Sequence, residues 1–154
     1  MKTDPNLPTI LLADDDPEDR MLAAEALEES GIANPLHSVA DGEELMNYLR
    51  SCATSETTSG PALPGLILLD LNMPRKDGRE ALAEIKHDPV FRKIPVVVLT
   101  TSKADEDILQ TYDLGVNSFI TKPVSFIALV DLMKSITSYW FDLVQLPPTS
   151  KHLV

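Results

Sequence analysis

Five short segments rich in apolar and β-branched residues recur along the chain, and each is typical of a strand. Four of them are largely apolar rather than alternating, which favours strands of a parallel sheet whose two faces are both covered by helices. The second segment, LHSVA, is less apolar and suits an edge of the sheet. The predicted strands are residues 9–13, 36–40, 66–71, 95–100 and 118–121.

Segments of helical length separate these strands. The first has Asp16 as its N-cap, Pro17 at its first helical position and Gly31 as its terminator. The last carries apolar residues at intervals of three and four, which predicts a face that packs on the sheet: Leu129, Met133, Ile136, Trp140 and Leu143. The four earlier helices are predicted over residues 17–30, 42–50, 78–87 and 104–114.

Strand and helix alternate five times, which predicts right-handed crossovers and a parallel sheet. We therefore expect an α/β, flavodoxin-like three-layer sandwich with a five-stranded sheet in the order 2-1-3-4-5. The domain is expected over residues 9–144, between tails at 1–8 and 145–154. Residues 51–64, rich in Ser, Thr, Gly and Pro, are predicted to form a long polar loop that contains Cys52. We find no linker that leads to a further domain.

Composition narrows the possible functions. The 154 residues include 13 Lys and Arg against 24 Asp and Glu, a net charge of −11, which argues against direct binding to nucleic acid. No apolar run approaches the ~20 residues of a membrane span, and residues 1–8 are too short and polar for a signal peptide. A single cysteine excludes an internal disulfide. We expect a cytoplasmic protein without a membrane partner.

Polar side chains follow the predicted strands at their carboxyl ends. Asp14 and Asp15 follow the first strand, Asp70 ends the third, Thr100 ends the fourth and Lys122 follows the fifth. The carboxyl ends of parallel strands share one edge of the sheet, and in this strand order the chain reverses direction between strands one and three. The sequence therefore predicts one acidic pocket there.

Three carboxylates in one pocket need a compensating cation. Because the predicted pocket offers oxygen ligands without sulfur or imidazole, Mg²⁺ is the expected metal. Capping of the first helix explains why Asp16 and Asp19 are acidic, but it does not explain why Asp14 and Asp15 are. Phosphoryl transfer to a carboxylate uses such a set: Asp70 attacks in line, Lys122 supplies a fixed cation and Thr100 donates from its hydroxyl.

Four motifs occur in order: ILLADDD, LILLDLNMPRKDG, VVVLTTS and SFITKP. Together they resemble the receiver domains of bacterial response regulators, including the single-domain chemotaxis type, over residues 9–144. The long loop, the stretch DLNMPRKDGRE and the aromatic C-terminal helix ending in LVQLPP resemble the small regulators of cyanobacterial phytochrome histidine kinases. Asp14 stands where many of those regulators have glutamate, which preserves the carboxylate.

The resemblance implies a role for each acidic position. Asp70 is similar to the phosphoacceptor of these receivers. Asp15 matches a direct Mg²⁺ ligand, Asp14 matches a ligand that acts through water, and the backbone carbonyl of Asn72 completes the protein ligands.

The resemblance also implies a conformational switch. Thr100 matches the switch hydroxyl, Phe119 the rotating aromatic ring, and Lys122 the phosphoryl-binding lysine that precedes a cis bond to Pro123. Asn72 and Ser102 occupy positions where the family tunes its dephosphorylation rate.

A phosphohistidine on a sensor histidine kinase, with a phytochrome as one candidate, is the expected donor. Beyond its own phosphorylation and dephosphorylation, no enzymatic activity is expected. Output is expected through contacts with another chain, whose identity the sequence does not give. Tyr139, Trp140 and Phe141 are consecutive, so they cannot all point from one helix into the protein core. A ring left exposed would suit a homodimer or partner surface.

Three alternatives compete with this interpretation. A phosphatase of the haloacid dehalogenase type needs a second aspartate two residues after the nucleophile, where this chain has Asn72. A flavodoxin-like cofactor binder would cradle phosphate after the first strand, where DDDP would repel it. A receiver that binds partners without being phosphorylated usually lacks an acid or the lysine, and this chain has all of them.

Overall fold

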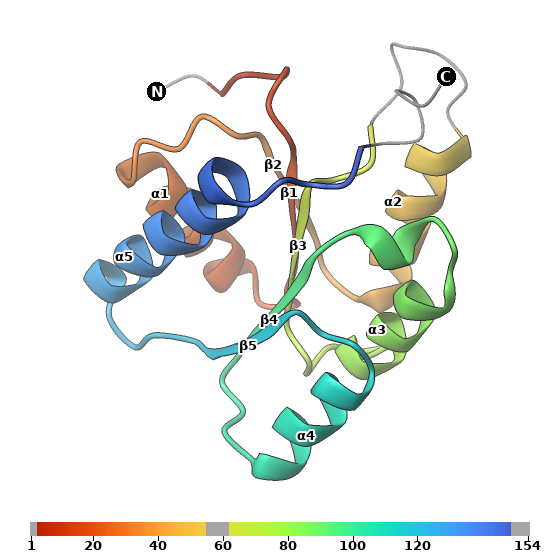
Figure 1. Ribbon diagram of the computed structural model, residues 1–154. Coiled ribbons are helices and arrows are strands. Elements are labelled where there is room, and N and C mark those ends of the chain that lie inside the picture. The colour runs from red at the N-terminus through yellow and green to blue at the C-terminus, as the bar shows by residue number, and fades with distance from the viewer. Residues whose placement is uncertain (1–2, 55–61, 149–154) are drawn as a thin grey trace.

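The computed structural model describes residues 3–54 and 62–148 (Figure 1). Its five strands are parallel and lie in the order β2-β1-β3-β4-β5, which confirms the predicted flavodoxin-like sheet. The edge position predicted for the second strand is also confirmed. The strands are β1 (Ile10–Ala13), β2 (Leu36–Val39), β3 (Leu66–Leu69), β4 (Val96–Thr100) and β5 (Ser118–Thr121).

Helices cover both faces of this sheet. Figure 1 shows α1 (Pro17–Glu29) and α5 (Phe126–Thr137) together on one face. On the other face lie α2 (Gly42–Thr54) and α3 (Gly78–His87), and α4 (Asp105–Asp113) lies next to β5. A 3-10 turn, η1 (Phe91–Lys93), precedes β4, and a π-helical segment, η2 (Ser138–Leu143), continues α5. No helix among the described residues is both long and apolar enough to cross a bilayer.

The core has two halves, one on each face of the sheet. Residues of α2 and α3, such as Leu45 and Leu82, pack on one face, and residues of α1 and α5, such as Leu27 and Met133, pack on the other. All residues of β1, β3 and β4 are buried, as predicted for strands covered on both sides. β5 is an edge strand, as the predicted order requires, but its residues are half-buried or exposed rather than buried on both faces.

The ends of α1 follow the predicted signals closely, and α3 adds a cap that was not predicted. Asp16 caps α1 by accepting a hydrogen bond from the Glu18 backbone N–H at 2.9 Å, and Pro17 occupies the first turn. Gly31 follows the helix with a φ of 77°, a conformation that glycine adopts without strain. At α3, Asp77 and Glu80 form a reciprocal capping box.

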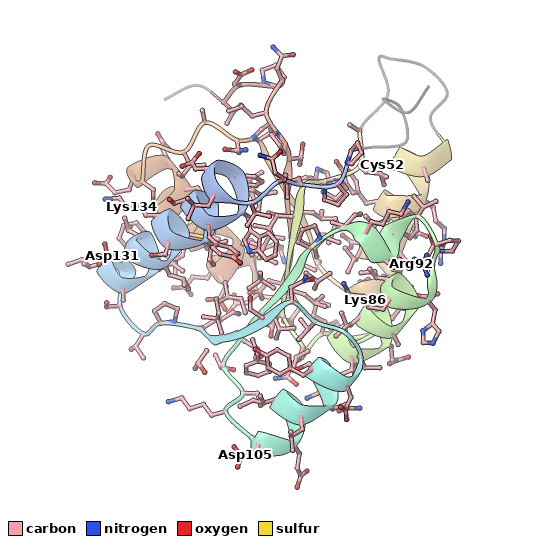
Figure 2. All side chains as sticks on the ribbon, in the orientation of Figure 1. Cys52, Lys86, Arg92, Asp105, Asp131 and Lys134 are labelled. Atoms are coloured by element: carbon pink, nitrogen blue, oxygen red, sulfur yellow. The ribbon has the colours of Figure 1, made fainter. Side chains whose placement is uncertain are left out.

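The long loop predicted over residues 51–64 is wrong at its start. α2 continues through residues 51–54, and Cys52 is buried in this last turn rather than placed in a polar loop (Figure 2). Leu45, Leu49 and Cys52 all lie in the core at intervals of four and three, so packing extends the helix into a polar sequence. Residues 55–61 of the predicted loop lie outside the described residues.

The apolar stripe predicted for the last helix holds only to Trp140. Leu143 is 74% exposed, although the 3.6-residue period places it on the buried face. The reason is the π-helical segment η2, whose i→i+5 hydrogen bonds put more residues in each turn and rotate the later side chains out of phase.

The predicted tails are partly packed on the domain. The Asp4 backbone N–H donates to the Ala33 carbonyl at 2.7 Å, and Asn34 Nδ2 donates to the Pro8 carbonyl at 2.9 Å. At the other end, Leu146 packs close to Gly65. Residues 1–2 and 149–154 lie outside the described residues, and the domain limits 9–144 stay a prediction.

Candidate functional site

The three predicted acids meet at the carboxyl edge of the sheet. Asp14 follows β1 and Asp70 follows β3, and the strand register pairs the residues just before them, Ala13 and Leu69. One carboxylate oxygen from each of Asp14, Asp15 and Asp70 lies within 4.8 Å of the others. Asp14 and Asp70 are only 2% and 7% exposed, whereas Asp15 is exposed. The strand ends therefore gather a pocket with two buried acids and one open to solvent.

Lys122 reaches into this pocket from the end of β5. Its Nζ donates to Asp14 Oδ2 at 2.6 Å, to Asp19 Oδ2 at 3.0 Å and to Asp70 Oδ2 at 3.3 Å. Burial alone would lower the pKa of Lys122, but hydrogen bonds to Asp14 and Asp19 and the charge of Asp70 outweigh it and raise that pKa above its usual value. The ammonium is therefore a permanent cation.

Asp14 is the least exposed acid of the cluster. Loss of solvent raises its pKa, while the hydrogen bond from Lys122 and the backbone N–H of Asp16 act in the opposite direction. That N–H donates to Asp14 Oδ1 at 3.0 Å, and Arg20 Nη1 donates to the Asp14 carbonyl at 2.7 Å. Hydrogen bonds thus fix both the carboxylate and the backbone of Asp14.

Thr100 contacts the second buried acid. Its Oγ1 is fully buried and donates to Asp70 Oδ1 at 2.9 Å. The backbone N–H of Asn72 donates to the same oxygen at 3.4 Å, and the N–H of Ser102 donates to Thr100 Oγ1 at 3.5 Å. Asp70, Thr100, Asn72 and Ser102 therefore form one connected group, and their roles stay a prediction.

The donor set fits a hard divalent cation. All three clustered ligands are carboxylates, and no cysteine or histidine joins the cluster found among the described residues. Carboxylate oxygens with one solvent-facing member suit an ion that keeps several waters, such as Mg²⁺ or Mn²⁺.

Of two sequence predictions about the switch region, the rotation of Phe119 stays a prediction and the cis peptide bond is wrong. Phe119 is partly buried against the core beneath α2 and α3, so its ring lies at an interior surface. No peptide bond among the described residues is cis, so the predicted cis bond between Lys122 and Pro123 is wrong. The bond is trans, the isomer that X–Pro bonds favour intrinsically.

The three consecutive aromatic residues separate as predicted into buried and exposed rings. Trp140 and Phe141 are partly buried against the core under α1 and α5, and Tyr139 is 53% exposed. The rings of Tyr139 and Trp140 meet edge to face with centroids 5.1 Å apart. Tyr139 is therefore the exposed member of the set.

Sequence reasoning missed Asp19, which it assigned to helix-start chemistry alone. Asp19 lies in the first turn of α1, and its Oδ2 accepts a hydrogen bond from Lys122 Nζ at 3.0 Å. The unusual acidic run DDDPED is the signal that could have identified it.

Comparison with known proteins places the chain in a clear context. Residues 10–134 match the family model described as the response regulator receiver domain. Response regulator Rcp1 of Synechocystis sp. is 43% identical over 138 residues, 90% of this chain and 92% of Rcp1. The probable methanogenesis regulatory protein FilR2 of Methanothrix harundinacea is 40% identical over 131 residues, 85% of this chain and 82% of that protein.

Solved structures similar to this chain belong to the same family. The phosphorylated cyanobacterial phytochrome response regulator RcpA superposes with a TM-score of 0.82 at 45% identity, covering 92% of this chain and 99% of RcpA. The Mn²⁺-bound form of Rcp1 gives a TM-score of 0.79 at 42% identity, covering 92% and 100%. The predicted resemblance, including its narrower phytochrome-regulator part, is confirmed.

Proposed function

We propose, since this chain belongs to the family of response regulator receiver domains, that Asp70 accepts a phosphoryl group from a phosphohistidine of a sensor histidine kinase. The observation that supports this most strongly is the pair of contacts on Asp70. Thr100 donates to one of its oxygens and Lys122 to the other, and Asp14 and Asp15 lie beside it. The relative RcpA is described as phosphorylated.

In the proposed reaction an oxygen of Asp70 attacks phosphorus. The new P–O bond forms as the P–N bond to the kinase histidine breaks, and the imidazole leaves with the electron pair and takes up a proton. Lys122 offers a positive charge, and Thr100 offers a hydroxyl, to the oxygens of the transferred group. The polypeptide supplies position and charge rather than a further covalent step.

Mg²⁺ is the metal we propose for this site. Asp15 would bind it directly, Asp14 through water, and Asp70 and the Asn72 backbone carbonyl would complete the protein ligands. The metal would screen the negative charges of the carboxylates and the phosphoryl group. The oxygen-only cluster and the Mn²⁺-bound structure of the relative Rcp1 support a divalent ion here.

Phosphorylation would act through a shift between two conformations. The phosphoryl group carries about 1.5 to 2 negative charges in place of the single charge of the Asp70 carboxylate, and its oxygens would draw the Thr100 hydroxyl toward them. Its departure would leave space that the Phe119 ring can fill, and the surface formed by α4, β5 and α5 would change. Asn72 and Ser102 would set how fast water removes the phosphoryl group.

The partners follow from the family and from the exposed surface. Receiver domains interact with histidine kinases, and the phytochrome regulators among the relatives support a phytochrome kinase as the donor for this chain. We infer that output passes through another protein rather than through nucleic acid, in keeping with the net charge of −11. Tyr139 is the exposed ring through which a homodimer would form, and Trp140 and Phe141 would support it from the core side.

The Asp70→Asn variant tests the proposed phosphoacceptor. With a small phosphodonor and Mg²⁺, the variant should take up no phosphoryl group, because an amide oxygen cannot replace the carboxylate nucleophile. Asp131→Asn, an exposed change on α5 (Figure 2), is the matched control and should label like the unmodified protein. Normal labelling of Asp70→Asn, measured by mass spectrometry of the intact protein, would end the proposal.

A further inference from the structure

Asp19 lies beside the cluster of three acids without belonging to it. The cluster found among the described residues consists of Asp14, Asp15 and Asp70. Asp19 is also the most exposed of the three acids that Lys122 contacts. Its side chain is 38% exposed, against 3% for Asp14 and 9% for Asp70. Asp19 therefore contacts the cation of the site without being one of the clustered ligands.

The ammonium of Lys122 divides its hydrogen bonds among these acids. A lysine ammonium has three N–H donors. Its Nζ lies 2.6 Å from Asp14 Oδ2, 3.0 Å from Asp19 Oδ2 and 3.3 Å from Asp70 Oδ2. Two of the three acceptors, Asp14 and Asp70, are proposed metal ligands. The positive charge of Lys122 therefore opposes a divalent cation at the same carboxylates, because like charges repel.

The surroundings of Lys122 offer few other acceptors. Its side chain is 15% exposed. It lines a cavity of about 150 Å³ between α1 and α5, whose walls include the apolar side chains of Leu22, Leu99 and Met133. An N–H that Asp19 did not accept would turn toward the other two carboxylates, since an unpaired donor with little access to water is costly. Asp19 thus takes a share of the ammonium that would otherwise fall to the metal ligands.

The start of α1 holds Asp19 in this place. Asp16 caps the helix by accepting from the Glu18 N–H at 2.9 Å, and its carbonyl accepts from the Arg20 N–H at 3.0 Å. The side chain of Arg20 then donates from Nη1 to the Asp14 carbonyl at 2.7 Å. These hydrogen bonds, made on both sides of Asp19, fix its backbone to the strand end that carries Asp14.

We propose that Asp19 is a positioning residue that draws the Lys122 ammonium toward α1 and so strengthens binding of a divalent cation at Asp14 and Asp70. This inference rests on the proposed function, in which those carboxylates hold Mg²⁺. Two effects of the Asp19 carboxylate have the same sign. Its negative charge attracts the metal, and the hydrogen bond that it accepts reduces the hold of Lys122 on the metal ligands.

Calorimetric titration of the full chain with MgCl₂, without a phosphodonor, tests the inference. Asp19→Asn should bind Mg²⁺ about threefold more weakly than the unmodified protein, within the range of a partly exposed ion pair. Asp19→Glu retains the charge, so its affinity should stay within about twofold of the unmodified protein. Glu18→Gln is the matched control, because it removes an exposed acid from the same turn of α1. Its affinity should also change by less than about twofold.

A second background shows whether Asp19 acts through Lys122. When Lys122→Met is already present, Asp19→Asn should weaken Mg²⁺ binding by less than about twofold, because the shared ammonium is gone. An equal loss in both backgrounds, or a loss no larger than that of Glu18→Gln, would overturn the inference and leave the proposed metal site standing. Absence of Mg²⁺ binding to the unmodified protein would instead overturn the proposed metal site, and this inference with it.

Discussion

At the scale of single residues, Lys122 has two tasks. The sequence predicts it as the cation for a phosphoryl group, and the structure adds that it neutralises buried carboxylates before any such group arrives. Its Nζ contacts Asp14, whose side chain is 3% exposed, as well as Asp19 and Asp70. Without a cation, carboxylates with this little access to water would be costly to keep ionised.

Replacing this cation should destabilise the metal-free protein. We expect Lys122→Met to lower the free energy of unfolding by about 3 kcal/mol, the lower end of the cost of removing one partner of a buried ion pair. Added Mg²⁺ should recover part of this loss, because the metal offsets the same carboxylates. Urea unfolding with and without Mg²⁺ measures both effects. Lys134→Met, an exposed change on α5 (Figure 2), is the control, and an equal loss in both variants would contradict the prediction.

The carboxyl ends of parallel strands meet at one edge of the sheet, and this rule explains how much of the site the sequence predicts. It places Asp14, Asp15, Asp70, Thr100 and Lys122 at one edge because topology alone decides where a parallel strand ends. It cannot place Asp19, whose contact with Lys122 depends on the direction of a helix relative to the sheet. The chemistry of such a pocket suggests the phosphoryl-transfer roles of Asp70, Thr100 and Lys122, whereas the separate metal-ligand roles of Asp14 and Asp15 come from the family resemblance.

At the scale of elements, local signals predict where helices start better than where they end. Asp16, Pro17 and Gly31 mark both ends of α1 because capping and left-handed φ are local properties. The end of α2 has no such marker, and the burial of Cys52 decides it instead. Tertiary packing can extend a helix through residues whose own preference is for a loop.

The contact between α2 and the edge strand β2 has a consequence at high pH. Tyr48 stacks on His37 with ring centroids 4.1 Å apart. Burial, followed by the neighbouring Cys52, raises the pKa of Tyr48 to about 12. An unfolded chain releases the phenol proton near pH 10, so the unfolded state binds fewer protons between pH 10 and 12. Stability should therefore fall as the pH rises through this window.

The Tyr48→Phe variant isolates that effect. It removes the phenol and keeps the ring that stacks on His37, so its stability should decline less between pH 10 and 12 than that of the unmodified protein. Urea unfolding at several pH values gives the two slopes. Identical slopes would show that Tyr48 ionises equally in both states, contrary to the raised pKa.

At the scale of the whole molecule, alternation of strands and helices predicts the topology because parallel strands need crossovers of one hand. It does not predict contacts of the chain ends, such as Leu146 against Gly65, since no periodic pattern encodes them. The same alternation concentrates charge. The chain has 24 acidic and 13 basic residues, spread along its length. The fold brings carboxylate oxygens of three of these acids within 4.8 Å of one another.

Because this cluster exists in the folded state and not in the unfolded chain, a divalent ion should stabilise the whole molecule. At a Mg²⁺ concentration one hundred times its Kd, the free energy of unfolding should rise by about 2.7 kcal/mol. Urea unfolding in MgCl₂, compared with NaCl at equal ionic strength, separates specific binding from screening of the net charge of −11. Asp15→Asn should lose most of the gain while its metal-free stability stays near that of the unmodified protein, because Asp15 is exposed. A gain of equal size in NaCl, or one that Asp15→Asn retains in full, would mean that these three carboxylates do not form a metal site.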